Sequence, residues 1–496
     1  MRGPMEGPQA VGGHKATFPL DTRHPADMNH APRSTSAFLP MAVSPRSPSK
    51  PPAKKTDSSS VGTSRRGKKL AIAPLTCPSQ SVHCNTMNAL QSIELFSGAG
   101  GLALGLHAAG FKHTALYEWN PSAVKTLCFN QAMGHESLKD CEIIRADVRN
   151  IDFRRHKGVD LVAGGPPCQP FSMGGKAAGM NDERDMFPQA VRAVSQIQPR
   201  AFIFENVRGL LRPAFSNYVE FIRLQMEFPN FPISNNVCWD QNLARLQRHK
   251  ERLGNDDSDL RYRVYVHQAN AADYGIPQQR HRVFFIGFRS DVETKWSFPK
   301  ATHSDESLRF SQFVQSDFWH RVGLNHRDYL EDDDSSKDKV STLKGSDRLK
   351  LPHLSPWVSL QEAIRDLPTP SSQASRKWLN HNLQDGARAY PGHTGSPLHR
   401  PAKALKAGDH GVPGGENMIA YPDGKVRYLS VRESARVQTF PDDYTFSGSW
   451  TEAMRQLGNA VPMELARIVG ESVAKALIQD SARDSLQSNN EALQST

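Results

Sequence analysis

Short apolar runs that alternate with helical stretches organise the middle of the chain. A first run at 92–96 leads through a glycine-rich turn into a short helix expected over 102–109. Six further runs have the length and composition of buried strands. They lie at 114–117, 141–145, 159–163, 201–204, 264–267 and 283–286. This alternation predicts an α/β fold with a doubly wound, Rossmann-like, mostly parallel sheet.

Helical spacing is clearest between the fourth and fifth runs. Apolar residues there recur three or four positions apart, which predicts a helix with one buried face. They are Phe187, Ala190, Val191, Val194 and Ile197. Near the C-terminus, Val469, Val473 and Leu477 predict a second such helix.

Changes in this pattern divide the chain into five segments. Residues 1–90 are rich in Pro, Ser, Gly and basic residues without a sustained period, so we expect a disordered tail. The α/β pattern covers 91–288, and a less regular separate domain is expected over 289–427. Helical patterning returns at 428–480, and the polar residues 481–496 are expected to fray.

The formal net charge is +10, but it is unevenly distributed. Residues 1–90 hold 12 lysines and arginines against 4 acidic residues, so most of the basic excess lies in the tail. Charge alone therefore says little about the ligands of the folded part. Met87 stands just ahead of the first strand, and we hypothesise that translation naturally starts there; native peptides from 1–86 would exclude this.

Two classes of protein are excluded by what the sequence lacks. It has no run of about 18 apolar residues and no signal-peptide pattern, so we expect a soluble, intracellular protein with no membrane partner. Its six cysteines show no Cys-x-x-Cys pair and no regular spacing with histidines. We therefore expect neither a disulfide framework nor a metal site.

The first turn has the composition of a cofactor loop. Gly98, Gly100 and Gly101 follow a strand and precede a helix, where backbone approaches a ligand closely. Glu118, about 20 residues on, is placed to accept hydrogen bonds from ribose hydroxyls. Asp147, after the third strand, is placed to read an adenine amino group. Such turns serve dinucleotides and S-adenosylmethionine alike, and some are purely structural.

The fourth strand leads into a candidate nucleophile, Cys168, within Gly-Gly-Pro-Pro-Cys-Gln-Pro-Phe-Ser. Two prolines hold the backbone before it, at the sheet edge where α/β folds bind ligands. The fifth strand brings Glu205 to the same edge, and Arg280 and Arg282 share one side of an extended chain. Taken one at a time, Cys168 could be an ordinary buried cysteine, and the glutamate and arginines could be solvent-exposed surface charges. Because all of them are expected at the same edge of the sheet, a catalytic site is favoured.

Six motifs, in order, resemble those of the DNA (cytosine-5)-methyltransferase family, of stand-alone bacterial or phage type. The resemblance covers roughly 91–290 and 428–480. The motifs are Phe96-Ser-Gly-Ala-Gly-Gly101, Pro166-Pro-Cys-Gln-Pro-Phe-Ser172, Glu205-Asn-Val207, Gln279-Arg-His-Arg282, Arg432-Glu-Ser-Ala-Arg-Val-Gln-Thr-Phe-Pro441 and Gln456-Leu-Gly-Asn-Ala-Val-Pro462.

The resemblance implies a set of roles. The cofactor would be S-adenosylmethionine, lined by Phe96, Ala99, Gly101, Glu118, Trp119, Asp147, Val148, Pro167 and Asn459, with Met186 a weaker candidate. Cys168 would add to C6 of a flipped cytosine. Glu205 would bond N3 and the amino group, Arg282 would hold the O2 side, and Arg280 would lie beside it or on a phosphate.

The resemblance also implies an architecture and partners. Residues 289–427 would be a target recognition domain inserted between catalytic motifs, and 428–480 would return to the methyltransferase domain. The substrate would be double-stranded DNA in the bacterial nucleoid. The protein would be a monomer, and a cognate restriction endonuclease would be a candidate partner. The target sequence is not encoded in any motif, and 399–408 reads either as a DNA groove contact or as a structural loop.

Three rival functions need separate explanations. An RNA methyltransferase acting on transfer RNA would use the same scaffold, although the long region 289–427 suits duplex recognition better. A nicotinamide oxidoreductase would explain the glycine turn and Glu118 but not Cys168 or Glu205. A catalytically dead DNA-binding relative would not need the complete set of candidate catalytic residues.

Overall fold

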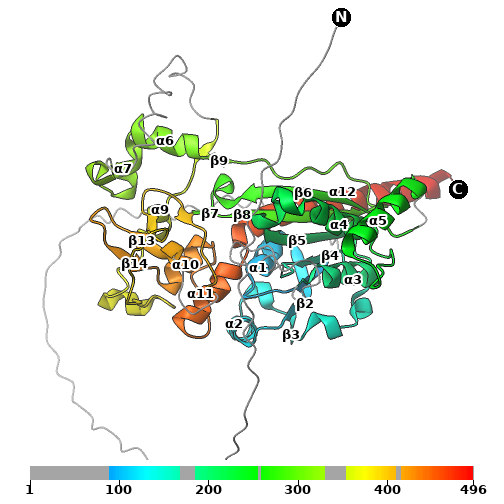
Figure 1. Cartoon of the computed structure of the whole chain (residues 1–496), viewed down its shortest axis with the longest axis horizontal. Coiled ribbons are helices and arrows are strands. Elements are labelled where there is room, and N and C mark those ends of the chain that lie inside the picture. The colour runs from blue at the N-terminus through cyan, green and yellow to red at the C-terminus, as the bar shows by residue number, and fades with distance from the viewer. Residues whose placement is uncertain (1–88, 168–184, 255–258, 330–352, 409–414, 495–496) are drawn as a thin grey trace, which may run out of the picture. The chain divides into compact units, whose positions relative to one another are not determined.

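A seven-stranded sheet forms the centre of the protein (Figure 1). The structure is a computed structural model, and it describes residues 89–167, 185–254, 259–329, 353–408 and 415–494. The strands are β1 (Leu90–Leu95), β2 (Phe111–Glu118), β3 (Glu142–Arg145), β4 (Leu161–Gly164), β5 (Ala201–Val207), β6 (Tyr262–Asn270) and β8 (His281–Arg289). All seven predicted runs are therefore strands.

The strand order is β3-β2-β1-β4-β5-β8-β6. The pairs from β3 to β5 are parallel, whereas β8 runs antiparallel to both β5 and β6. The chain builds outward from β1 in one direction and then from β4 in the other. Ligands of such sheets bind at the carboxyl ends of the strands where the order reverses. The prediction of a doubly wound, mostly parallel sheet is confirmed.

Helices cover both faces of this sheet. One face packs against α3 (Phe187–Ile197), α4 (Ser216–Glu227) and α5 (Trp239–Leu253). The other face packs against α1 (Gly101–Ala108) and α12 (Met463–Gln494). The five residues that predicted the helix over 187–197 are all buried in the first of these cores, and that prediction is confirmed.

Helices α1 and α12 pack closely because small residues face each other. A Cβ added to Gly105 would collide with Met463 O, and one added to Gly470 would come within 2.9 Å of Leu106 Cδ2. Val469, Val473 and Leu477 are buried on the same side of α12, as their spacing predicts. Helix α12 therefore packs on the main sheet.

We predict that Gly105→Ala destabilises the fold. Alanine favours a helix over glycine by about 1 kcal/mol, but here its methyl group meets the backbone of α12, which cannot move aside as a side chain can. Overpacking costs about 1–3 kcal/mol and should dominate. Thermal unfolding measures the effect, and Ala108→Ser, at an exposed position of the same helix, should leave the melting temperature nearly unchanged.

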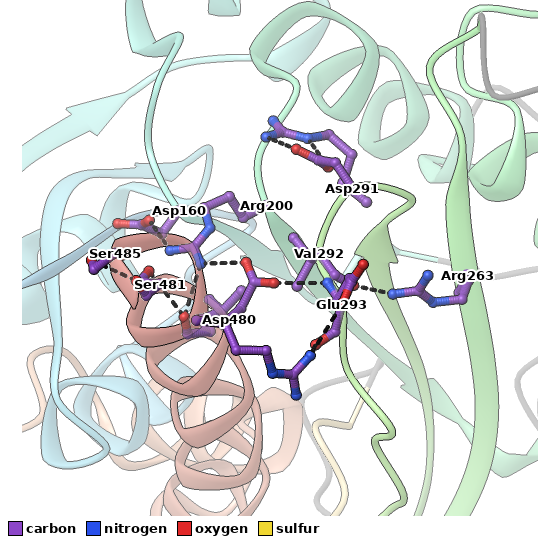
Figure 2. Close-up of polar contacts among 12 residues, drawn as sticks. Asp160, Arg200, Arg263, Asp291, Val292, Glu293, Asp480, Ser481 and Ser485 are labelled. Atoms are coloured by element: carbon purple, nitrogen blue, oxygen red, sulfur yellow. Dashed lines mark hydrogen bonds and ion pairs between the residues drawn. The ribbon is translucent and has the colours of Figure 1, made fainter. Parts of the chain in front are cut away.

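After residue 480, where we expected a frayed tail, α12 continues to Gln494 in the described part of the chain. Figure 2 shows the contacts that hold this helix to the sheet at Asp480. Arg200 pairs with Asp160 at 3.2 Å and with Asp480 at 2.9 Å, and Asp480 also accepts a hydrogen bond of 2.7 Å from the backbone N–H of Glu293. Polar contacts thus anchor α12 where its buried apolar face ends.

The remaining elements are mostly short, as expected for a less regular region. Before the region 289–427 lie α2 (Pro121–Ala132) and β7 (Gln278–Gln279). Within it lie β9 (His303–Ser304), α6 (Asp305–Phe313), α7 (Asp317–Val322), β10 (Ser355–Pro356), α9 (Leu360–Ile364), β11 (Ser396–Pro397), β12 (Ala402–Lys403), β13 (Met418–Ala420) and β14 (Val426–Tyr428). After it come α10 (Val431–Val437) and α11 (Trp450–Asn459).

Among its described residues, the region 289–427 has a small core of its own, around Phe318 and Trp319. A second core is shared with the main domain, since Leu398 and Leu405 belong to the same cluster as Leu127 of α2. The segment 399–408 includes β12, which pairs with β7, so the structural reading of that loop is supported. The domain boundaries at 289 and 427 stay predictions.

Candidate functional site

The turn after β1 is held open at the carboxyl edge of the sheet. Phe96, Gly98 and Gly100 all have positive φ angles, of 58°, 55° and 90°. This conformation is strained for Phe96, whereas glycine adopts it without strain. A Cβ added to Gly98 would meet nothing within 4 Å, so space remains beside this loop.

Glu118 ties that loop to the end of β2. Its two carboxylate oxygens accept hydrogen bonds of 2.7 Å from the backbone N–H groups of Gly98 and Asn120. Burial raises the pKa of Glu118, and these backbone donors partly oppose the rise. The neighbouring Trp119 is 66% exposed, which is unusual for a large aromatic side chain beside a buried carboxylate. Glu118 and Trp119 therefore lie together at the rim of the glycine turn.

Asp147, expected to read an adenine amino group, already binds a neighbouring arginine. Arg149 donates from Nε and Nη2 to its carboxylate at distances between 2.6 and 3.0 Å, and these bonds lower the pKa of Asp147. An adenine amino group would have to share this carboxylate with Arg149. The next residue, Val148, is buried in the hydrophobic core between the sheet and α3.

Other residues expected at the cofactor site divide into buried and exposed ones. Ala99 is buried, and its carbonyl accepts a 2.8 Å hydrogen bond from the Tyr444 hydroxyl. A Cβ on Gly101 would collide with Val461 O, so this glycine permits close packing against the motif at 456–462. Pro167 and Asn459 are exposed at the surface.

The loop that leads to the candidate nucleophile is fixed to β5. Asn206 donates a 2.9 Å hydrogen bond from Nδ2 to the carbonyl of Pro166, and the Met186 N–H donates to the carbonyl of Pro167 at 3.1 Å. Cys168 itself lies outside the described residues. The backbone immediately before it is nevertheless held at the carboxyl ends of β4 and β5. Asn206 was not predicted to hold this loop, although it stands inside the Glu205-Asn-Val207 motif.

Glu205 lies directly against this loop. A Cβ on Gly165 would come within 3.3 Å of Glu205 Oε2. Glu205 is 6% exposed and forms an ion pair through Oε1 with Nε of Arg282, which is 9% exposed. Burial raises the pKa of Glu205 above its ordinary value, although Arg282 and Arg280 oppose this. The structure thus joins Glu205 and Arg282 beside the entry to the Cys168 segment.

Arg280 does not have the open position expected of a substrate contact. Its side chain is 1% exposed, and its two terminal nitrogens donate to the backbone carbonyls of Leu405, Gly458 and Ala460. The i, i+2 spacing could not show that these three distant carbonyls converge on it. The catalytic role predicted for Arg280 gains no support from this geometry.

The described residues show neither a metal-binding cluster nor a membrane-spanning helix. Within them, no group of three or more His, Cys, Asp or Glu side chains is arranged to hold a metal ion. No described helix is long and apolar enough to cross a membrane.

Comparison with known proteins agrees with this arrangement. The family model for C-5 cytosine-specific DNA methylase matches residues 90–243 and 242–475. The Type II methyltransferase M.NgoMIV of Neisseria gonorrhoeae is 32% identical over 394 residues, which is 78% of this chain and 97% of that relative. M.PspPI of a Psychrobacter strain is 29% identical over 392 residues, 78% of this chain and 79% of its own.

One similar solved structure is a putative DNA modification methyltransferase encoded within an E. coli prophage. It is 21% identical in sequence, the match covers 78% of this chain and 99% of the other chain, and the TM-score is 0.43. The fold therefore rests on the strand order above. The family model covers both halves of the predicted methyltransferase domain, and one relative matches along nearly its whole length. The chain accordingly belongs to the C-5 cytosine-specific DNA methylases and is a DNA (cytosine-5-)-methyltransferase.

Proposed function

We propose that this enzyme transfers a methyl group from S-adenosylmethionine to C5 of a cytosine within a specific double-stranded DNA sequence. The observation that carries the proposal is the buried Glu205–Arg282 pair beside the loop that leads to Cys168. A carboxyl group next to a guanidinium suits the N3, amino and O2 edge of cytosine.

The residues around the glycine turn suit the proposed cofactor. Space beside Gly98 admits a ligand, the Glu118 carboxylate has lone pairs left for ribose hydroxyls, and the exposed Trp119 ring offers a stacking surface. Phe96, Ala99 and Gly101 shape the loop, and Val148, Pro167 and Asn459 complete the proposed lining. Asp147 would serve the adenine amino group alongside Arg149. When bound, S-adenosylmethionine supplies the electrophilic methyl group.

The side chains of this protein make the cytosine reactive. The Cys168 thiolate adds to C6, which pushes electrons toward C5. Glu205 holds a proton at N3, so that the ring does not accumulate negative charge, and Arg282 bonds O2 while keeping Glu205 in place. C5 would then accept the methyl group, leaving S-adenosylhomocysteine, and loss of the C5 proton to a base would break the C6–sulfur bond. Cys168 is thereby restored.

A stacked cytosine cannot reach Cys168, so we infer that the base is flipped out of the duplex, at a cost of a few kcal/mol. The region 289–427 would read the target sequence. The similarity to Type II methyltransferases supports a restriction-modification setting, with a cognate endonuclease as partner, in the bacterial nucleoid. A single copy would suffice, since the proposed residues all belong to one chain.

We predict that Trp119→Ala weakens cofactor binding. Loss of base stacking costs about 1–3 kcal/mol, which is about a ten- to hundredfold rise in the dissociation constant. Calorimetry with S-adenosylhomocysteine measures this without any reaction. Phe129→Ala removes another exposed aromatic ring, on α2, and should leave the affinity unchanged. Equal affinities for Trp119→Ala and wild type would remove Trp119 from the site.

Transfer of a labelled methyl group to duplex DNA and to transfer RNA tests the substrate. We expect incorporation into DNA, at cytosines that bisulfite sequencing places in one recurring sequence. Incorporation into transfer RNA alone would favour the RNA methyltransferase instead.

A further inference from the structure

Arg280 is a buried cation without a carboxylate partner among the described residues. Its Nη1 donates to Leu405 O at 3.0 Å, and its Nη2 donates to Gly458 O at 2.6 Å and Ala460 O at 2.9 Å. Burying a guanidinium is costly, so these three carbonyls must matter to the fold around them.

Two of these carbonyls stand at the end of helix α11. The last carbonyls of a helix have no partner within it, and they carry the negative end of the helix dipole. Arg280 binds Gly458 O and Ala460 O, on either side of Asn459, the last residue of α11. A cation donating to terminal carbonyls is a favourable helix cap. Here the cap comes from a segment 178 residues away in the sequence.

A second side chain completes the cap. Gln438 donates from Nε2 to Leu457 O and also approaches Ala460 O at 3.3 Å. Gln278 links the two parts, since it donates to Gln438 Oε1 at 3.1 Å and accepts from the Leu405 N–H at 3.0 Å. The end of α11 is thus held by side chains that come from the arginine motif and from α10.

We propose that Arg280 is a positioning residue for the cofactor site: by capping α11 it fixes the backbone on both sides of Asn459. This inference rests on the proposed function, because Asn459 is a cofactor contact only in that reading. Arg282, two residues on, contacts the base edge, whereas Arg280 acts through the backbone beside Asn459. The segment that leads into β8 thus serves the two ligands with alternate arginines.

The chain offers a control in Arg200, which lies at the amino ends of β4 and β5. It is partly buried and holds α12 to the sheet through Asp160, the carbonyl of Leu477 and Asp480. None of these is a residue of the proposed cofactor lining. Removing either arginine leaves acceptor groups without their donor, so both changes should lower the melting temperature. Only the loss of Arg280 should change the backbone beside Asn459.

Calorimetry with S-adenosylhomocysteine on the full chain tests the proposal. We expect Arg280→Ala to raise the dissociation constant by about a hundredfold, since supporting contacts of a site are worth about 10–100-fold in affinity. Arg280→Lys keeps the charge and most of the volume but not the planar fork, and should raise it about tenfold. Arg200→Ala should leave it within about twofold. Added guanidinium ion should restore part of the affinity of Arg280→Ala but not alter that of wild type.

Wild-type affinity in folded Arg280→Lys, or equal losses of affinity in Arg280→Ala and Arg200→Ala, would overturn the proposal. If Arg280→Ala does not fold, the lysine variant alone decides. Failure of the proposed function would appear differently, because wild type itself would then not bind S-adenosylhomocysteine.

Discussion

Cys168→Ala should abolish methyl transfer to DNA, with a loss of at least about 10⁴-fold in the rate at saturating substrate. Without the sulfur, no covalent bond to C6 activates C5, and no other step in the mechanism supplies that activation. Binding of duplex DNA and of S-adenosylhomocysteine should persist, because alanine leaves the held backbone before this residue intact. Single-turnover transfer of labelled methyl groups measures the rate, and a filter or fluorescence assay measures DNA binding.

Two other cysteines provide the controls. Cys128 and Cys238 are free and exposed. Their replacement by alanine should leave the rate nearly unchanged. A rate near wild type in Cys168→Ala would refute the assignment of the nucleophile, and a loss in Cys128→Ala or Cys238→Ala would move it elsewhere.

Glu205→Gln should reduce methyl transfer by about 10²–10⁴-fold, which is the usual contribution of a general acid. Glutamine fills the same space and can still hydrogen-bond cytosine, but it cannot exchange a proton at N3. Arg282 would lose its charged partner, so DNA affinity is the necessary control; it should change far less than the rate. A rate within a few-fold of wild type would show that the proton of Glu205 is dispensable.

The pH dependence follows from the environment of Glu205. Because burial raises its pKa, the carboxyl keeps its proton to higher pH than an exposed glutamate does. Cys168 must lose its proton, which favours high pH, whereas Glu205 must keep one, which favours low pH. The single-turnover rate between about pH 5 and pH 9 should therefore pass through a maximum. In Glu205→Gln the fall on the alkaline side should disappear, while the acidic side remains.

Much of the sheet could be predicted because its strands are buried. Phe202 and Phe204 pack on one face of β5 and Ile203 on the other, so the run reads as continuously apolar. Helix α5 was missed for the opposite reason. Only Asn242, Leu243 and Leu246 of its 15 residues are buried, so its sequence looks like a polar loop.

The candidate site could be predicted only in part. Glu205 stands near the end of β5 in the parallel part of the sheet, where position along the chain determines the edge that a side chain reaches. Arg282 reaches the same edge because it stands near the start of β8, which runs antiparallel to β5. The partners of Arg280 could not be found in this way, because Leu405 and Gly458 lie 125 and 178 residues from it. The Arg149 contact to Asp147 is local, but it depends on a side-chain conformation that no pattern specifies.

Covalent trapping on duplex DNA that carries 5-fluorocytosine at the target position tests the central claim most directly. Fluorine at C5 cannot leave as a proton does, so the bond between the cysteine sulfur and C6 should persist after methyl transfer. We expect a cofactor-dependent protein–DNA adduct whose mass-spectrometric mapping places the modified base on Cys168. No adduct, or an adduct on Cys128 or Cys238, would contradict the account.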